Sequence, residues 1–510
     1  MKKTYHNPVH RGFFPDPSVI RAGEYYYKVN SSFQYFPAIP ISRSKDLVHW
    51  EIVSHAITDP SYLDLSETLD SRGIWAPDIS YSNGKYFIFA PLRHNYDDKI
   101  GHAMRSQLVM TADRPEGPYS KPIVLDVDDI DPSHFVDDDG KHYMIIAPAV
   151  TVVPLSDDCS KITGEIKQVW AGTGERCSEG PHILKKDGWY YAIVAEGGTG
   201  YGHGINVARS RNLYGPYEEC PYNPVMRQLD ENAPIQRAGH GCLVETNKGE
   251  WWCMYLCGRP NGGKYTTVGR ETALDKVTWT EDGWFLINGG NGPSVESEVP
   301  DLEEEIYEKF TFDDFDSENL NVNWEWVRNP EPNGYSLTEN KGHMRLYTLD
   351  GELSEVSAKN TLVRREQELS YTACTKMSFS PNEGEQAGIV CYYSTKTYAS
   401  FSLRKHNGEN VLVLAVNKNM GEEIVKETPC PAGELILKVE VNGLTRKFYY
   451  SVDGVNYEPA GVLTDCIYLC DEGVPEDRKR HTGTLVGIYA NNGHGGTKNY
   501  ADFDWFSYKD

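Results

Sequence analysis

The sequence DPSVIRAGEYYY, residues 16–27, decides the fold, because its pattern returns four more times along the first half of the chain. Each copy consists of a short polar signature, a strand-like run, a turn with glycine and an aromatic run. The other copies are APDISYSNGKYF (76–87), DPSHFVDDDGKHY (131–143), EGPHILKKDGWYY (179–191) and GHGCLVETNKGEWW (239–252). Asn-Gly, Asp-Gly and other glycine-containing turns supply the positive φ that tight hairpins need. We therefore expect five β-hairpins of one design.

The spacing of the copies indicates the size of each unit. They lie roughly 48–62 residues apart, which leaves room for two further strands after each hairpin. Five four-stranded units around one axis make a five-bladed β-propeller. The composition agrees, since 33 Tyr, 11 Trp, 46 Gly and 29 Pro suit short aromatic strands separated by tight turns. The sequence thus predicts an all-β protein.

Three of the polar signatures place an acid at the start of the innermost strand: Asp16, Asp131 and Glu179. The first strand of each blade lines the central channel, so these carboxyl groups should converge on one pocket. Carboxylates that meet in a channel repel one another, and one of them should keep its proton and serve as an acid. Alternatively, Asp-Pro-Ser and Glu-Gly-Pro only punctuate turns. Their equivalent positions in a repeat favour the functional interpretation.

The ordered set of motifs is similar to glycoside hydrolase family 43, the five-bladed β-propeller inverting glycosidases. The resemblance runs through GFFPDPS (12–18), GIWAP (73–77), DPS (131–133), EGP (179–181), GHG (239–241) and GRET (269–272). Residues 30–50, with FQYFP (33–37) and SKDLVHW (44–50), resemble the β-xylosidase and α-L-arabinofuranosidase branch. That branch carries a C-terminal β-sandwich, for which this chain has the length.

The resemblance implies catalytic roles for the three acids. Asp16 matches the family's general base, Glu179 its general acid, and Asp131 the third carboxylate, which raises the pKa of the acid and orients it. An inverting glycosidase needs one carboxylate to activate water and one carboxylic acid to protonate the leaving oxygen, about 6.5–9.5 Å apart. This chemistry needs no cofactor.

The resemblance also implies residues that bind the substrate. Arg270 would hydrogen-bond the hydroxyls of the terminal sugar, and His240 would lie at the centre of the propeller below the pocket. Phe33, Trp75 and Ala76 would form the wall around that sugar. Four of them have a structural alternative: His240 as a turn histidine, Arg270 in a surface ion pair, and Phe33 and Trp75 in core packing.

Two positions depart from the pattern of related β-xylosidases. An aromatic residue usually precedes the third carboxylate, where this chain has Ile130. A phenylalanine from the sandwich often closes the pocket, and the matching loop here reads HTG at 481–483. Both differences affect the shape of the terminal-sugar pocket, and with it the balance between xylose and arabinofuranose.

The second domain is expected after a linker rich in glycine, proline and charge at residues 288–305. We assign residues 1–295 to the propeller and 306–510 to a β-sandwich of jelly-roll or concanavalin-like type, from the alternation of strand-like runs and turns. In the resembling enzymes this domain packs on the propeller and helps to close the pocket. It can also bind a structural calcium, for which Asp314 and Asp504 are the candidate ligands.

The net charge and the hydropathy of the chain limit the kinds of partner that it is expected to bind. With 74 Asp and Glu against 50 Lys and Arg, the net charge is −24, which disfavours binding to nucleic acid. No apolar run reaches the ~18–20 residues of a membrane span, so we expect a soluble protein that does not bind membranes. Residues 1–8 are basic without a following apolar segment, so we expect a cytoplasmic protein, or one whose leader was trimmed.

The cysteines indicate neither disulfides nor a zinc knuckle. The 11 Cys are scattered over the chain. Cys253 and Cys257, like Cys466 and Cys470, stand four apart in apolar, strand-like runs, without CxxC spacing. We therefore expect reduced thiols in the core.

The leading hypothesis is an exo-acting inverting glycosidase that releases terminal β-D-xylosyl or α-L-arabinofuranosyl residues. Its substrates would be xylo-oligosaccharides or arabinoxylan, and a homo-oligomer is possible. The alternatives are a glycosidase of this fold acting on another sugar, a retaining fructosidase-type propeller, or a sugar-binding propeller without catalysis. The fructosidase alternative is weak, because the Asn-Asp-Pro-Asn and Glu-Cys motifs are missing. Loss of one acid would favour a binding protein, yet all three are present.

Overall fold

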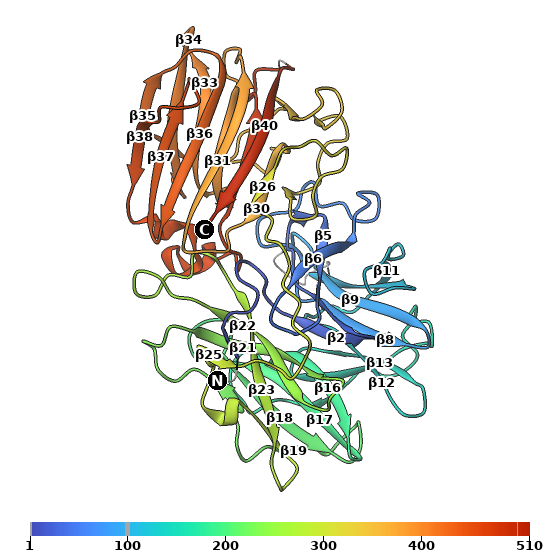
Figure 1. Cartoon of the computed structure of the whole chain (residues 1–510). Helices are drawn as coiled ribbons and strands as arrows, with labels where there is room; N and C mark the ends of the chain where they lie inside the picture. The colour runs from blue at the N-terminus through green and yellow to red at the C-terminus, as the bar shows by residue number, and fades with distance from the viewer. Residues whose placement is uncertain (1–2, 97–102, 497) are drawn as a thin grey trace.

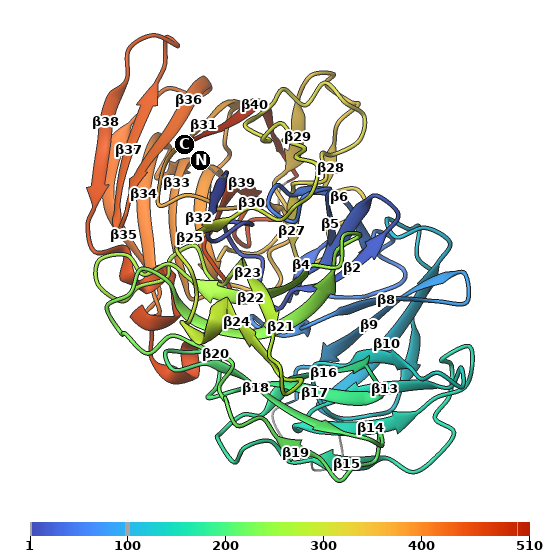
Figure 2. The same cartoon turned by 60° about the horizontal axis from the view of Figure 1, so that its bottom comes forward.

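The computed structural model describes residues 3–96, 103–496 and 498–510. Five antiparallel sheets follow one another around a common axis, and Figure 2 shows them in chain order from blue to yellow-green. The first sheet contains β2 (Ser18–Ala22), β3 (Tyr25–Val29), β5 (Ala38–Ser44) and β6 (Glu51–Ile57). The second contains β8 (Asp78–Ser82), β9 (Lys85–Arg93), β10 (Arg105–Ala112) and β11 (Ile123–Leu125), with β7 (Gly73–Ile74) beside β9. The predicted five-bladed propeller is thereby confirmed for its first two blades.

The other three blades repeat the arrangement. The third contains β12 (Ser133–Val136), β13 (His142–Ile146), β14 (Val150–Pro154) and β15 (Lys167–Trp170). The fourth contains β16 (Glu179–Lys186), β17 (Trp189–Glu196), β18 (Gly204–Ser210) and β19 (Glu218–Glu219), with β20 (Met226–Arg227) beside β18. The fifth contains β21 (Gln236–Glu245), β22 (Trp251–Gly258), β23 (Glu271–Trp279) and β24 (Phe285–Ile287), followed by the 3₁₀ turn η1 (Asn288–Gly290). Each repeated sequence motif forms the first two strands of one blade.

The hairpin turns have the backbone that the sequence predicts. Asn83 and Gly84, between β8 and β9, have φ of 50° and 80°, and Asp187 and Gly188, between β16 and β17, have φ of 50° and 73°. Two successive positive φ angles match the right-handed twist of the strands that they join. The turn chemistry therefore sets the register of these inner hairpins.

The N-terminal segment fastens the first blade to the last. β1 (Thr4–His6) pairs with β25 (Glu296–Glu298) of the linker. The Asn7 side chain donates to the carbonyl of Leu274 in β23 and accepts from the Leu274 amide, over 2.8 and 2.9 Å. His10 then forms a β-bridge with Thr272. The ring of blades is closed by these contacts.

Two eight-stranded sheets form the C-terminal β-sandwich, seen in orange and red in Figure 1. One contains β26 (Phe312–Asp313), β28 (Tyr335–Ser336), β29 (Met344–Tyr347), β31 (Ser370–Phe379), β36 (Gly433–Asn442), β37 (Thr445–Ser451), β38 (Glu458–Leu463) and β40 (Tyr500–Lys509). The other contains β27 (Glu325–Val327), β30 (Thr361–Arg365), β32 (Gln386–Ser394), β33 (Thr397–His406), β34 (Glu409–Lys418), β35 (Glu422–Pro429) and β39 (Leu485–Asn491), with β4 as its eighth strand. Apolar side chains from both sheets fill one continuous core.

The eighth strand comes from the propeller. β4 (Tyr35–Phe36) lies between β3 and β5 of the first blade in sequence, yet it pairs with β27 at the edge of a sandwich sheet. The pairing sets Phe36 opposite Trp326 and Tyr35 opposite Val327. The two domains thus share a sheet, which the sequence motifs did not predict.

Buried charges add to this interface. Arg237 of β21 pairs with Asp471 at 3.1 Å and with Glu472 at 3.2 Å. Both acids lie in η3 (Asp471–Gly473), which stands with η2 (Cys466–Leu469) and η4 (Glu476–Arg478) between β38 and β39. Arg328, after β27, pairs with Asp70 of the propeller at 2.9 Å. Removing one partner of such a buried pair leaves an uncompensated charge in the interior, which destabilises the interface.

Two of the four cysteines that stand four apart in sequence do not lie in strands, contrary to the prediction from sequence. Cys466 begins the 3₁₀ turn η2 and Cys470 directly follows it, so neither is in a strand, whereas Cys253 and Cys257 do lie in β22. All four thiols are free and buried. Within the described ranges, no helix is long and apolar enough to cross a membrane.

Gly269 generates a prediction about the interface. Its φ is +82°, and a Cβ there would lie 2.6 Å from the backbone of Gly483 in the sandwich. Gly249 also has a positive φ, +77°, but a Cβ there would meet nothing within 4 Å. We expect Gly249→Ala to cost about 1–2 kcal/mol through backbone strain alone, and Gly269→Ala to cost at least twice as much. Thermal unfolding of both variants measures the difference, and equal shifts in Tm would contradict the close contact.

Candidate active site

The acids stand where the innermost strands of three blades begin. Asp16 and Asp131 come two residues before β2 and β12, and Glu179 is the first residue of β16. Asp16 has a φ of 52°, Asp131 of 58° and His240, in β21, of 47°. A left-handed backbone at three buried non-glycine residues is uncommon and tends to cluster at functional sites. The repeat therefore brings strained, polar positions together around one axis.

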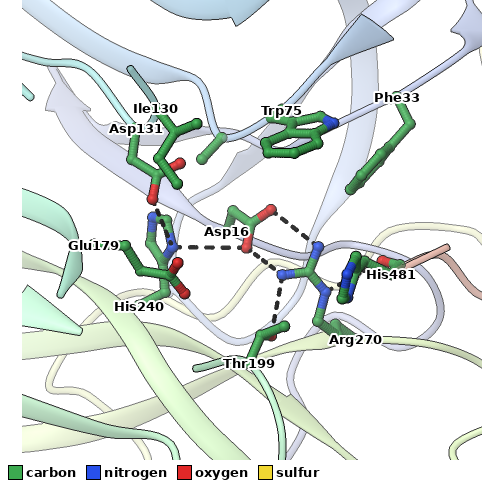
Figure 3. Close-up of a pocket in the computed structure, with 11 residues that line it drawn as sticks. Asp16, Phe33, Trp75, Ile130, Asp131, Glu179, Thr199, His240, Arg270 and His481 are labelled. Carbon is green, nitrogen blue, oxygen red and sulfur yellow. Dashed lines mark hydrogen bonds and ion pairs between the residues drawn. The ribbon is translucent and has the colours of Figure 1, made fainter. Parts of the chain in front are cut away.

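All eight residues that the sequence predicted for catalysis and substrate binding line one pocket of about 120 Å³. Figure 3 shows the acids around its floor and Trp75 and Phe33 along one wall. The lining comprises Asp16, Phe33, Trp75, Ala76, Ile130, Asp131, Glu179, Thr199, His240, Arg270 and His481. A pocket of this size accommodates a single sugar ring rather than a chain.

Asp16 is held as an anion by a fork of donors. Arg270 donates from Nη1 to Asp16 Oδ1 over 2.7 Å and from Nη2 to Oδ2 over 3.3 Å, and the Ser31 hydroxyl donates to Oδ2 over 2.5 Å. Burial alone would raise the pKa of Asp16, but the charge of Arg270 and the Ser31 hydrogen bond hold it below its ordinary value. Asp16 is therefore ionised at neutral pH and able to accept a proton.

Glu179 has the opposite character. Burial raises its pKa to about 7, and the negative charge of Asp16 adds to the effect. Burial and the charge of Glu179 likewise raise the pKa of Asp131, which accepts a hydrogen bond from the Gly180 amide over 2.9 Å. Two neighbouring buried carboxyl groups cannot both ionise cheaply, so the pair keeps a proton near neutral pH. The site thus combines an ionised carboxylate with a protonated acid.

His240 lies between two of the acids. Its Nδ1 is 3.7 Å from Asp16 Oδ1 and 3.9 Å from Asp131 Oδ2. Burial lowers the pKa of His240 to about 4, so the ring is neutral at pH 7 and separates the carboxylates without adding charge. Gly180 makes room for it, because a Cβ at this position, where φ is +59°, would lie 3.0 Å from the imidazole.

Aromatic packing builds the wall of the pocket. Phe33 and Trp75 approach each other with ring centroids 6.3 Å apart, and Phe13 packs behind Phe33 at 5.6 Å. Phe33 is 2% exposed, and its backbone forms a β-bridge with Ile74. The rings of Phe33 and Trp75 therefore line the pocket and also pack against the hydrophobic core. The predicted role in the pocket wall and the alternative of core packing both apply to them.

The sandwich contributes His481, as its alignment with the closing position of related enzymes suggested. The His481 carbonyl accepts from Arg270 Nε over 3.2 Å, and the His481 amide donates to Asp471 over 2.9 Å. Asp471 is the partner of Arg237 across the interface. The same network that joins the domains therefore holds one side of the pocket.

Sequence reasoning missed two residues near Glu179. Thr199 lines the pocket and accepts from Arg270 Nη1 over 3.3 Å. The buried His203 places Nε2 3.8 Å from Glu179 Oε1, while its Nδ1 lies 3.3 Å from the Arg237 carbonyl. Both belong to the glycine-rich stretch at residues 197–204. The available signal was its position directly after β17, the partner of the strand that begins with Glu179.

The two predicted calcium ligands, Asp314 and Asp504, make local contacts with other residues. Asp504 pairs with Lys376 at 3.0 Å, and the exposed Asp314 accepts the Asp316 amide over 3.2 Å. Among the described residues, neither belongs to a group of three or more His, Cys, Asp or Glu side chains close enough to share an ion. Calcium takes six to eight oxygen ligands, among them backbone carbonyls and water, so calcium binding by Asp314 and Asp504 stays a prediction.

The raised pKa of Glu179 predicts a cost in stability. Its folded pKa of about 7 exceeds the ordinary 4.5, so ionisation opposes folding as the pH rises from 4.5 to 7. We expect Glu179→Gln to be more stable than the native chain at pH 8, by up to about 3 kcal/mol, with the gain vanishing near pH 4.5. Thermal unfolding at several pH values tests this. The exposed Glu231→Gln is the control, and a gain that does not depend on pH would contradict the assignment.

Comparison with known proteins agrees with this geometry. The family model "Glycosyl hydrolases family 43" matches residues 5–285, and "Beta xylosidase C-terminal Concanavalin A-like domain" matches residues 312–509. The chain is 35% identical to a xylan 1,3-beta-xylosidase from a Vibrio species, over 100% of this chain and 99% of that protein. It is 33% identical to a non-reducing end alpha-L-arabinofuranosidase from Bacteroides ovatus, over 100% and 95%.

A solved structure gives the same result. The family 43 protein BlXynB from Bacillus licheniformis is 55% identical and superimposes with a TM-score of 0.96, over 99% of this chain and 100% of that one. Both domain models and these full-length relatives lead to one conclusion: the chain belongs to family 43 of the glycosyl hydrolases, and it is a glycosidase.

Proposed function

We propose that this enzyme is an exo-acting inverting glycosidase that releases terminal β-D-xylosyl or α-L-arabinofuranosyl residues. The carrying observation is the pairing of an ionised Asp16 with a protonated Glu179 in a pocket for one sugar ring. These are the two states that single-displacement hydrolysis requires. The relatives named as a β-xylosidase and an α-L-arabinofuranosidase support these two sugars.

The reaction needs only carboxyl groups and water. Asp16 takes a proton from a water molecule while the oxygen of that water attacks the anomeric carbon. Glu179 gives its proton to the glycosidic oxygen as that bond breaks, so charge and protons balance in one step. Asp131 holds Gly180 through the amide hydrogen bond and so orients Glu179. Arg270 fixes Asp16 through Nη1 and Nη2, and its remaining Nη2–H is the donor that we assign to the substrate. No cofactor takes part.

The walls of the pocket favour the end of a sugar chain. Trp75 and Phe33 close one side and His481 of the sandwich closes another, so the pocket lacks the open cleft that an internal unit would need. Xylo-oligosaccharides and arabinoxylan present such ends. Ile130 and His481 set the shape of this pocket, so they are the residues that we propose to govern the ratio between the two sugars.

The different-class alternative is a sugar-binding propeller without turnover. The three acids and their opposed ionisation favour hydrolysis, since binding alone would not require a protonated carboxyl group beside an ionised one. Binding of an aryl xyloside without release of the aryl group would support the alternative.

Loss of the acid gives a specific kinetic prediction. We expect Glu179→Ala to lower kcat on xylobiose by about 10²–10⁴-fold, and much less on an aryl β-D-xyloside whose leaving group needs no proton. Asp16→Ala should lose activity on both, because water activation is needed in either case. Hydrolysis of xylobiose and of aryl β-D-xylosides and α-L-arabinofuranosides measures this, with Glu231→Ala as control. Equal losses of Glu179→Ala on all substrates would refute the acid role.

The pH profile separates the two carboxyl groups. Activity should fall as the pH rises through about 7, because Glu179 then loses its proton. Ser31→Ala removes a hydrogen bond that lowers the pKa of Asp16, so the acidic limb of kcat/KM should move to higher pH. The basic limb should stay in place, since Ser31 contacts only Asp16 of the three acids. A shift of the basic limb alone would reverse the assignment.

A further inference from the structure

A cluster of three metal-binding side chains lies in the third blade, outside the pocket. His134 belongs to β12, His142 begins β13, and Cys159 stands in the loop after β14. Each offers one ligand atom, and these atoms lie within 4.8 Å of one another. None of the three lines the pocket or contacts the acids. Among the residues that the structure describes, no other group of this kind is present.

The distances between the ligand atoms match those around a tetrahedral ion. His134 Nε2 is 2.9 Å from His142 Nδ1, and Cys159 Sγ is 3.3 Å from His142 Nδ1 and 3.6 Å from His134 Nε2. With Zn–N bonds of about 2.0–2.1 Å and a Zn–S bond of about 2.3 Å, tetrahedral angles place two nitrogens about 3.3 Å apart and nitrogen and sulfur about 3.6 Å apart. Shifts of a few tenths of an ångström would therefore admit the ion.

Without an ion, hydrogen bonds between the three atoms include weak ones to sulfur. A neutral imidazole carries one ring proton and one lone pair. If one of the two facing ring nitrogens donates to the other, the only available lone pair is used. The Cys159 thiol then makes only weak hydrogen bonds, as a donor or an acceptor, 3.3 Å from His142 Nδ1 and 3.6 Å from His134 Nε2. A cation accepts all three lone pairs at once.

The surroundings of His134 resemble the outer shell of a metal site, whereas Nε2 of His142 is buried with no hydrogen-bond partner. The Ser80 hydroxyl lies 2.6 Å from Nδ1 of His134, so it fixes the orientation of that ring and leaves Nε2 for the ion. Phe87 and Phe89 pack on the His134 ring at 4.9 Å each, which keeps water away from one side.

The backbone holds the other two ligands in place. The Leu155 amide donates to the His142 carbonyl over 2.9 Å, and the Cys159 amide donates to the Ser156 carbonyl over 2.8 Å. Cys159 itself has a φ of 56° and is fully buried, although it lies in a short surface loop. The loop is therefore shaped to turn the thiol inward.

We propose that His134, His142 and Cys159 bind a zinc ion, with water as the fourth ligand. Two imidazoles and a thiolate are the donors that zinc prefers, and calcium and magnesium are excluded because they require oxygen ligands. Binding releases the thiol proton, as every metal thiolate requires. The ion would tie the loop after β14 to the first two strands of the blade. Its role is structural and separate from hydrolysis, so the inference does not depend on the proposed function.

Cobalt(II) tests the site directly, because a thiolate bound to cobalt gives a charge-transfer band in the near ultraviolet. We expect titration of the full chain with CoCl₂ to produce this band at one equivalent and ZnCl₂ to abolish it. Cys159→Ser should lose the band, and Cys177→Ser, which changes an exposed free thiol, should keep it. Absence of the band in the native chain, or its persistence in Cys159→Ser, would overturn the proposal.

Stability and activity provide the second readout. ZnCl₂ should raise the Tm of the native chain and of Cys177→Ser but not that of Cys159→Ser or His142→Gln, because only a site that binds the folded state stabilises it. Circular dichroism shows whether each variant is folded before titration. Hydrolysis of an aryl glycoside by the native chain should be the same with and without zinc. Equal Tm shifts in all four proteins would show adventitious binding to the acidic surface and would overturn the proposal.

Discussion

The pocket depends on one buried guanidinium. Arg270 is the positive charge that contacts Asp16 in a space that three carboxyl groups share, and without it the ionised Asp16 would be stranded in the interior. The same side chain contacts Thr199 of the fourth blade and the His481 carbonyl of the sandwich. A single residue therefore sets the charge of the proposed base and joins three parts of the molecule around the substrate. A change in the position of Arg270 would alter its contacts with Asp16, with Thr199 and with the His481 carbonyl.

Charge balance explains why the acids differ in protonation although they sit in the same pocket. Asp16 has the guanidinium and a hydroxyl donor, whereas Glu179 and Asp131 face each other with one backbone amide between them. The propeller supplies this asymmetry, because each blade places a different neighbour beside its first strand. The different protonation of Asp16 and Glu179 thus arises from their different places in a repeating fold.

Most of the propeller and the lining of the pocket could be predicted from sequence, and the reason is local. Hairpin turns such as Asn83-Gly84 fix short-range geometry, and the acids stand at equivalent points of a repeat, so their convergence follows from the period. Contacts between distant segments carry no such signal. The pairing of β4 with β27, the approach of His203 to Glu179 and the gathering of His134, His142 and Cys159 depend on three-dimensional packing. The ion pair between Lys376 and Asp504, one of the two acids predicted as calcium ligands, carries no sequence signal either.

The shared sheet has a consequence for how the chain reaches its native state. Residues 35–36 are synthesised long before residues 325–327, with which they pair. During translation the first blade must keep this short segment open, with unpaired backbone groups, until the sandwich emerges. A propeller produced without the sandwich would expose residues 35–36. The apolar surface around Phe36, which pairs with Trp326, would be exposed as well. Separating the two domains would therefore leave an unpaired strand edge beside apolar side chains, a condition that favours aggregation.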